Sequence, residues 1–253
     1  MANYRMVVQY DGTNYKGWQV QNSTNDTIQG KLQHILSILA DSPVEVIGSG
    51  RTDAGVHALG QVANFHIDLE NEISASDLMT YINEHLPEDI AVTALTQEDE
   101  RFHARYSEKG KTYRYRIHVS PIANVFEKRF IYSYTDMPLD TAAMRKAAAL
   151  LVGKHDYKSF CGNKHMKKST VRTITSIDIK EVTDDNGLRE VDIYYSGDGF
   201  LQNMIRILTG TLIEVGTGRR APESMSDLLE AKNREAAGYT APPQGLCLME
   251  VYY

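Results

Sequence analysis

A short glycine-rich segment, residues 48–57, holds three side chains that could do chemistry. Arg51, Asp53 and His57 fall within seven positions of one another, among three glycines. Glycine lets a backbone approach a ligand closely, and loops commonly carry the polar side chains of binding sites. A carboxylate held beside a guanidinium stays ionised and can act as a nucleophile or a base. The segment therefore predicts a functional loop centred on Asp53.

Other interpretations of this loop stay open from the residues alone. A phosphate cradle would need the glycine, lysine and hydroxyl spacing of a P-loop, which the segment lacks. A metal site would need a third ligand beside Asp53 and His57, and no recognisable spacing supplies one. Asp53 could also close a turn by bonding to neighbouring backbone groups, which is the commoner role of an aspartate in a glycine-rich loop. Composition and periodicity do not overturn that structural role.

Two further side chains could serve such a loop. Arg206 lies in an apolar segment expected to be helical over residues 200–215, with polar neighbours three and four positions away. This arginine could face water or form a bidentate pair with a carboxylate. Gly210 in the same helix, which costs about 1 kcal/mol relative to alanine, indicates close backbone packing. Tyr113 could stack on an unpaired base beside cationic neighbours or pack in the core, whereas Tyr115 is expected in the core.

The hydrophobic periodicity predicts an α+β fold with a central, mainly antiparallel sheet flanked by helices. Consecutive strands joined by short turns favour this sheet over a doubly wound parallel one, and Asp185-Asn186-Gly187 is a strong hairpin signal. Strands are expected over residues 5–10, 44–47, 61–67, 90–96, 112–119, 171–182, 190–195 and 246–251. Helices are expected over residues 27–40, 74–86, 141–152, 200–215 and 222–232.

The chain is expected to form two similar halves that together make one catalytic unit. Residues 1–106 would carry the glycine-rich loop, and residues 107–253 would carry the Tyr113 strand and the Arg206 helix. No apolar run approaches bilayer-spanning length, and the N-terminus lacks a signal-peptide core, so the protein is expected to be cytoplasmic with no membrane partner. Cys161 and Cys247 show no disulfide or zinc spacing and are expected to be reduced and buried.

Charge is distributed unevenly along the chain. A net charge of −6 would ordinarily argue against a nucleic-acid partner. Residues 66–100, however, contain ten acidic residues and no lysine or arginine, whereas residues 101–129 contain eight lysines or arginines against two glutamates. Residues 154–172 are also basic. This asymmetry fits a polyanion-binding face, and on charge alone it fits ordinary solvated faces equally well.

Several motifs, in order along the chain, resemble those of the tRNA pseudouridine synthase A family over essentially the whole length. The most specific is Gly50-Arg51-Thr52-Asp53-Ala54-Gly55-Val56-His57-Ala58, which is similar to the family signature around its catalytic aspartate. The supporting matches are Tyr10-Asp11-Gly12, Phe102-His103-Ala104-Arg105, Tyr113-Arg114-Tyr115, Gly199-Phe200-Leu201-Gln202-Asn203-Met204-Ile205-Arg206, and Ala241-Pro242 continuing to Leu248.

The resemblance implies isomerisation of uridine to pseudouridine at positions 38 to 40 of the tRNA anticodon arm. It implies a homodimer, two halves with the active cleft between them, and no metal, nucleotide or organic cofactor. Asp53 would be the nucleophile, Tyr113 would stack on the target base, Arg206 would pair with the aspartate, and Arg51 would fill the space left by the flipped uridine. The further substrate-binding residues expected on this basis are Thr52, His57, Arg105 and Arg114.

Two rival functions remain from the residues. A catalytically silent RNA-binding module would use the same basic segments, and a phosphotransferase could use an aspartyl nucleophile. Ordinary glycosidases use two carboxylates, whereas the motif here places one. Residues 161–168 do not match the family pattern residue by residue, and their lysines could contact RNA or solvent.

Overall fold

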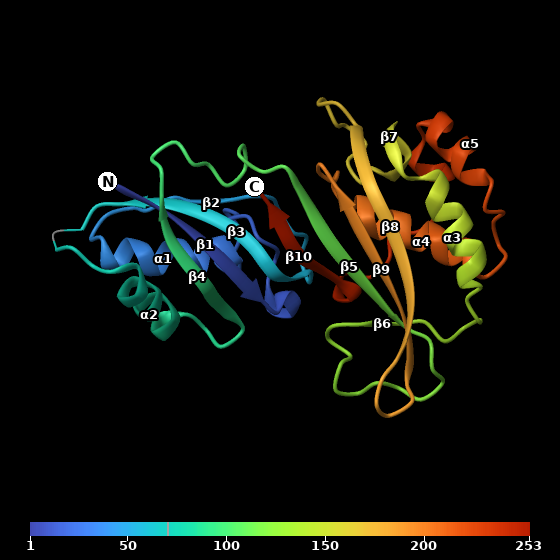
Figure 1. Cartoon of the computed structure of the whole chain (residues 1–253), viewed down its shortest axis with the longest axis horizontal. Helices are drawn as coiled ribbons and strands as arrows, with labels where there is room; N and C mark the ends of the chain where they lie inside the picture. Colours follow the sequence, from blue (N-terminus) through green and yellow to red (C-terminus); the bar gives the residue numbers. More distant parts are fainter. Residues whose placement is uncertain (70) are drawn as a thin grey trace. The chain divides into compact units, whose positions relative to one another are not determined.

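The computed structural model describes residues 1–69 and 71–253, which fall into two compact units. The first unit comprises residues 1–109 together with 248–253, and the second comprises residues 110–247 (Figure 1). The end of the chain thus packs with the N-terminal residues, although it was expected in the second half. The glycine-rich loop lies in the first unit, whereas Tyr113 and Arg206 lie in the second.

The sheet of the first unit is built around β1 and β3, which pair antiparallel, and β4 pairs antiparallel with the other edge of β1. Alternate residues of β1 from Tyr4 to Tyr10 are buried, as expected for a strand with one covered face. The helix α2 packs against β4 and α1. The elements are β1 (Ala2–Tyr10), α1 (Ile28–Leu39), β2 (Val46–Gly48), β3 (His57–Ile67), α2 (Ala75–His85), β4 (Ile90–Glu98) and, from Leu248 on, the C-terminal β10 (Leu246–Tyr252).

Local capping signals place the helices of this unit. The Thr27 side chain accepts a hydrogen bond from the Gly30 N–H at the start of α1, and Ser74 accepts one from the Asp77 N–H at the start of α2. Pro87 follows α2, as expected from the sequence. The predicted strand and helix order of the first half is therefore confirmed.

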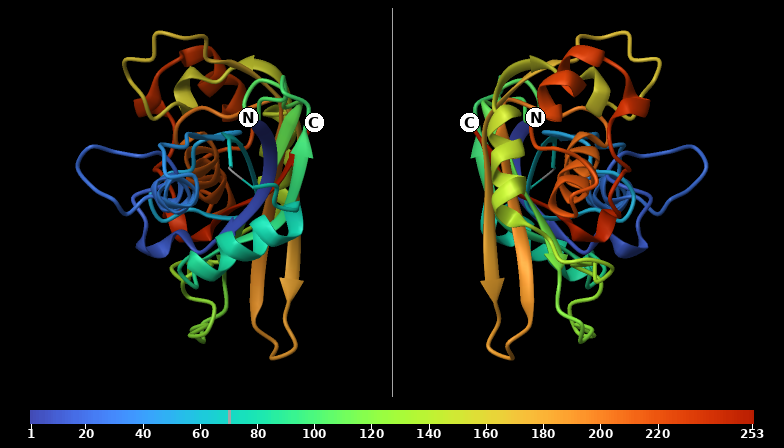
Figure 2. Two further views of the ribbon diagram at one scale, coloured as in Figure 1. Left: turned by 90° about the vertical axis from the view of Figure 1, so that its left-hand side faces the viewer. Right: turned by 90° about the vertical axis from the view of Figure 1, so that its right-hand side faces the viewer.

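The second unit has its own antiparallel strands in the order β5–β9–β8–β7, and α3 packs against β8 (Figure 2). The predicted hairpin is confirmed, because Thr183 of β8 pairs with Arg189 of β9 and Gly187 takes a φ of +76° in the turn. The elements are β5 (Gly110–His118), β6 (Tyr132–Ser133), α3 (Thr141–Leu150), β7 (Gly153–Asp156), β8 (Val171–Thr183), β9 (Arg189–Gly197), α4 (Met204–Gly216) and α5 (Ser224–Ala231).

The helix that carries Arg206 begins later than the periodicity predicts. It was expected from residue 200, but α4 begins at Met204 because Asn203 adopts a left-handed backbone conformation with φ 58°. Gly199, with φ +155°, also departs from helical geometry. Arg206 therefore sits in the first turn of the helix, where the chain has just changed direction.

The expected fold class is confirmed: the protein is α+β, and its strands pair mainly antiparallel. The short strands β6 and β7 were not expected. No helix within the described residues combines the length and apolar character needed to cross a membrane.

Candidate active site

The Asp53 loop connects β2 to β3 and is held from the side by the chain segment around residues 12–18. The Trp18 N–H donates to the Thr52 carbonyl at 3.1 Å, and the Gly55 N–H donates to the Tyr15 carbonyl at 3.3 Å. Gly17 has a φ of +98°, and a Cβ at this position would lie 2.7 Å from the Thr52 carbonyl oxygen. These backbone contacts fix the loop without using its outward-facing side chains.

The turn that follows Asp53 is closed by backbone atoms. The Val56 N–H donates to the Asp53 carbonyl at 3.2 Å, and Gly55 supplies the left-handed conformation with φ +77°. The Asp53 side chain itself is partly exposed. The turn thus has a backbone closure of its own.

Thr52 and His57 support the loop from its buried side. The Thr52 hydroxyl lies 2.8 Å from the Tyr10 hydroxyl, and His57 Nδ1 accepts the Gly12 N–H at 3.0 Å. Thr52 is 7% exposed and His57 is 3% exposed. Both are predicted substrate-binding residues, and the structure places them on the buried side of the loop, where their contacts fix its position relative to residues 10–12.

Arg51 lies on the exposed side of the same loop. Its Nε donates to the Gln19 side-chain oxygen at 2.9 Å. The Gln19 amide in turn donates to the side-chain oxygen of Gln29 at 2.7 Å, and Gln29 donates to the Val46 carbonyl at 2.7 Å. This chain of amide hydrogen bonds orients the guanidinium of Arg51, which precedes Asp53 by two residues. The two glutamines were not predicted, because no motif or periodicity in the sequence connects them to Arg51.

Tyr113 occupies the middle of β5 in the second unit. It is 7% exposed, and its ring packs edge-to-face against Phe200 with centroids 5.5 Å apart. Its neighbour Tyr115 is fully buried and donates its hydroxyl to the Pro242 carbonyl at 2.7 Å, which confirms the predicted core position. The Tyr113 ring thus has a fixed orientation.

Arg206 is held by two groups that precede and follow it in the chain. Its Nε donates to the Ala241 carbonyl at 2.7 Å, and one terminal nitrogen donates to the Asn203 side-chain oxygen at 3.0 Å. The Ala241 N–H donates back to the Arg206 carbonyl at 3.0 Å. These contacts set the direction of the guanidinium plane.

Gly210 makes the contact with Ala241 possible. A Cβ on Gly210 would lie 2.0 Å from the Tyr239 carbonyl oxygen, so only glycine lets residues 239–241 run this close to α4. The close backbone packing predicted at this position is confirmed. The sequence does not predict Asn203 and Ala241 as partners of Arg206, although both lie in the family motifs, at residues 199–206 and 241–248.

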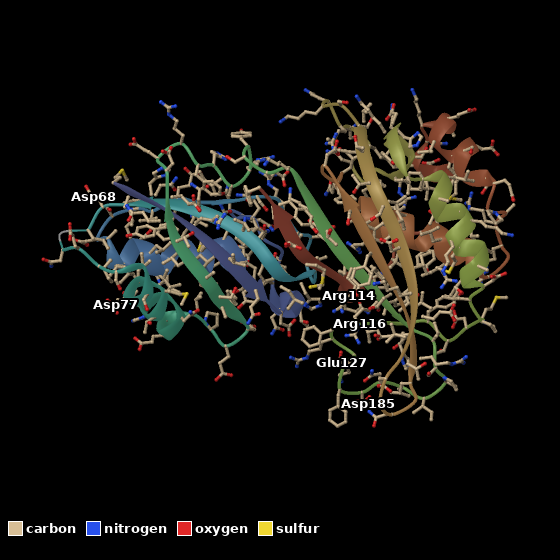
Figure 3. The ribbon with its side chains drawn as sticks, in the orientation of Figure 1. Asp68, Asp77, Arg114, Arg116, Glu127 and Asp185 are labelled. Atoms are coloured by element: carbon tan, nitrogen blue, oxygen red, sulfur yellow. The ribbon has the colours of Figure 1, made fainter. Side chains whose placement is uncertain are left out.

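The arginines of β5 are balanced by acidic residues. Arg116 donates to Glu127 at 2.5 Å and to Glu190 at 2.8 Å, and Arg114 lies 3.9 Å from the Asp192 carboxylate. Arg114, Arg116 and Glu127 are labelled in Figure 3. Burial, followed by the charge of Glu190, raises the pKa of Asp192 to about 6. Arg114, predicted to bind substrate, thus has a carboxylate of its own chain as its neighbour.

Arg105 lies in the loop between β4 and β5 and is exposed. Its backbone N–H donates to His103 Nδ1 at 3.2 Å, and the ring of His103 stacks on Tyr106 with centroids 4.2 Å apart. The buried Asn64 side chain accepts the Ala104 N–H at 2.9 Å and anchors this loop to β3. Arg105 therefore stands on a supported surface loop of the first unit.

The cysteines differ from expectation in part. Cys161 is buried as expected, whereas Cys247 is partly exposed. Within the described residues, no three His, Cys, Asp or Glu side chains are grouped in a way that could hold a metal ion.

The fold and this loop together define an α+β protein that carries the aspartate of the glycine-rich motif, Asp53, on a connection between two strands. Comparison with known proteins gives the family. The family model described as tRNA pseudouridine synthase matches residues 6–107 and 147–253. The intervening stretch, which includes Tyr113 and Arg114, lies outside these two ranges.

Relatives of the chain match it over nearly their full length. It is 45% identical to the "tRNA pseudouridine synthase A" of Bacillus sp. (strain KSM-64) over 98% of both chains. It is 42% identical to the protein of the same name from Brevibacillus brevis and 43% identical to the "tRNA pseudouridine synthase A 1" of Clostridium tetani, each over 100% of both chains. The chain belongs to the tRNA pseudouridine synthase family.

Proposed function

We propose that this protein isomerises uridine to pseudouridine in tRNA, with Asp53 as the nucleophile. The observation that carries the proposal is the Asp53 loop: a partly exposed aspartate stands on a loop that backbone contacts hold in place. The family membership supplies the reaction class, since the relatives are named as enzymes that act on tRNA.

The reaction needs one carboxylate and consumes nothing. The bond between ribose C1′ and uracil N1 breaks, the base turns, and C1′ joins C5; C5 loses a proton and N1 gains one. Asp53 could add to C1′, add to the base, or abstract a ribose proton. In each route the ionised carboxylate is the reactive form, so a neighbouring cation that keeps it ionised favours the reaction.

Arg206 is the cation in this proposal. Its contacts with Ala241 and Asn203 hold the guanidinium in one orientation, as a bidentate partner of a carboxylate requires. Tyr113 would stack on the target base and could move a proton, and its packing against Phe200 supports a ring held in place for stacking.

The remaining predicted residues take supporting roles. Arg51, exposed on the loop, would fill the space left by the flipped uridine, and Arg105 would contact a phosphate. In place of direct substrate contact, we propose that Thr52 and His57 position the loop and that Arg114 stabilises the buried Asp192. Flipping costs a few kcal/mol of stacking, which phosphate contacts would offset.

The finer assignments follow the resemblance of the ordered motifs. The substrate would be the anticodon arm, with uridines at positions 38 to 40 as targets. The enzyme would act as a homodimer in the cytoplasm, without a metal, nucleotide or organic cofactor.

The test compares two aspartate replacements in the first unit. Asp53→Asn should abolish pseudouridine formation on a tRNA transcript while leaving tRNA affinity and the urea unfolding midpoint unchanged. Asp41→Asn is the matched control, because Asp41 is exposed and its φ of 47° suits asparagine. It should keep the full rate.

Reaction conditions separate the rival functions. Wild-type protein should make pseudouridine in EDTA without any nucleotide, whereas activity that requires magnesium and ATP would favour the phosphotransferase. Binding without product would favour a silent RNA-binding module. An Asp53→Asn protein with the wild-type rate would show that the nucleophile has been assigned wrongly.

A further inference from the structure

The most basic stretch of the second unit surrounds a loop that the family resemblance leaves without a role. Residues 154–172 contain six lysines or arginines and a single acidic residue, Asp156, in a chain whose net charge is −6. We call residues 163–169 the basic loop. Its lysines, Lys164, Lys167 and Lys168, and its histidine, His165, are all exposed.

Nearby acidic groups offset little of this charge. The Asp156 carboxylate accepts the Thr170 hydroxyl at 2.5 Å and lies 3.3 Å from the Lys232 ammonium. The hydrogen bond from Thr170 lowers its pKa, and Lys232 adds to that effect. Lys164 pairs with Glu235 at 3.1 Å in an exposed ion pair, which is weak. Asp156 is thus paired with Lys232, and Glu235 with Lys164. The basic loop therefore keeps a net positive charge.

The base of the loop is fixed to the residue that orients Arg206. The Gly162 N–H donates to the Gln202 carbonyl at 2.8 Å. A Cβ at Gly162 would lie 2.7 Å from Asn203 Nδ2 and 3.1 Å from Asn203 Cβ. The loop therefore starts in contact with the Asn203 side chain, whose oxygen accepts the hydrogen bond from Arg206.

We infer that the basic loop is a tRNA phosphate-binding surface, and that its Gly162 anchor positions Arg206 through Asn203. An exposed cluster of lysines on an otherwise acidic chain is the charge pattern that polyanion binding requires. The second part of the inference rests on the proposed function, because it gives Arg206 its partner in the reaction. The first part needs only RNA binding, so the two can be tested separately.

The binding part is tested with Lys167→Gln/Lys168→Gln against the control Lys146→Gln/Lys180→Gln. Both pairs remove two exposed positive charges from the second unit, and the control pair lies on α3 and β8. Both are made in Asp53→Asn protein, so that the measurement does not depend on turnover. The affinity for tRNA transcript is measured across a salt series.

The loop pair should lower tRNA affinity on the order of tenfold near 0.1 M salt and reduce the slope of log K against log salt by about 1 to 2. The control pair should leave the slope as it is. An unchanged slope in the loop pair, or an equal change in the control pair, would overturn the phosphate-binding surface.

The positioning part is tested with three variants in the active protein. Gly162→Ala displaces the Asn203 side chain, and Asn203→Gly removes the oxygen that Arg206 uses while glycine accepts the left-handed backbone. Both should lower kcat by roughly 10- to 100-fold, without changing KM or the salt slope. Asn203→Asp retains an acceptor oxygen and should recover most of the wild-type kcat.

The outcomes separate this inference from the proposed function. Wild-type protein that makes no pseudouridine refutes the proposed function, yet the salt series still decides the role of the loop. Wild-type kcat in Asn203→Gly, or an Asn203→Asp protein as slow as Asn203→Gly, would refute the positioning role. Urea unfolding midpoints identify any variant that loses activity through loss of fold.

Discussion

Replacing Gly210 by alanine tests how the structure holds Arg206. The new Cβ would lie 2.0 Å from the Tyr239 carbonyl oxygen and 2.9 Å from its carbonyl carbon, closer than the 3.0 Å below which real Cβ contacts essentially never occur. Residues 239–241 must therefore retreat by about 1 Å, because helix backbone cannot yield instead. Ala241, which accepts the Arg206 Nε–H at 2.7 Å, moves with them.

The magnitude follows from three terms. Overpacking costs about 1–3 kcal/mol, and the weakened hydrogen bond to a charged donor adds about 1.5–3 kcal/mol. Alanine returns about 1 kcal/mol through its higher helix propensity. We expect Gly210→Ala to lower the free energy of unfolding by about 1.5–5 kcal/mol. A guanidinium displaced by about 1 Å should also lower kcat by on the order of 100-fold.

Urea unfolding and steady-state kinetics at saturating tRNA measure the two effects. Gly187→Ala is the matched control, since Gly187 has a φ of +76° and a Cβ added there would meet nothing within 4 Å. That change should cost about 1–2 kcal/mol of backbone strain and leave kcat unaltered. A Gly210→Ala protein with the wild-type unfolding midpoint and kcat would refute the argument that this glycine sets the position of Ala241.

Two further predictions concern buried polar groups. Burial, followed by the charge of Glu190, raises the pKa of Asp192 to about 6. The stability that protonated Asp192 contributes is therefore full below about pH 4 and is lost as the pH rises through 6. The free energy of unfolding should fall by up to about 3 kcal/mol over this range. Urea unfolding between pH 4.5 and 8 should show this fall in wild type and not in Asp192→Asn; parallel pH profiles would contradict it. Thr52→Val removes the 2.8 Å contact with the Tyr10 hydroxyl and should cost about 1–3 kcal/mol, whereas Thr52→Ser should restore most of it. Equal unfolding midpoints for the two variants would count against the supporting role of Thr52.

Much of the architecture could be predicted from the sequence because its signals are local. Periodicity and caps placed α1 and α2, and the turn before residue 188 placed the β8–β9 hairpin. The close packing at Gly210 was also readable, since a glycine inside an apolar helix needs a reason. The ordered motifs indicated the family, and the family match over residues 6–107 and 147–253 confirms it.

Tertiary structure decided which polar side chains are exposed and which are already bonded within the chain. Arg114 and Arg116 alternate along β5, and Glu127, Glu190 and Asp192 from other segments balance their charge. The pairings with Glu190 and Asp192 depend on the register between β5 and β9, which local spacing does not encode.

The Asp53 loop shows the same division. The sequence alone shows the glycines and the aspartate of this loop and predicts its place between two strands. That Thr52 and His57 lie beneath the loop while Arg51 stays exposed follows only from contacts with Tyr10, Gly12 and Gln19. The sequence by itself determined which residues are available for chemistry. The tertiary structure decided which of them are buried and hydrogen-bonded, because such contacts arise only when distant segments pack together.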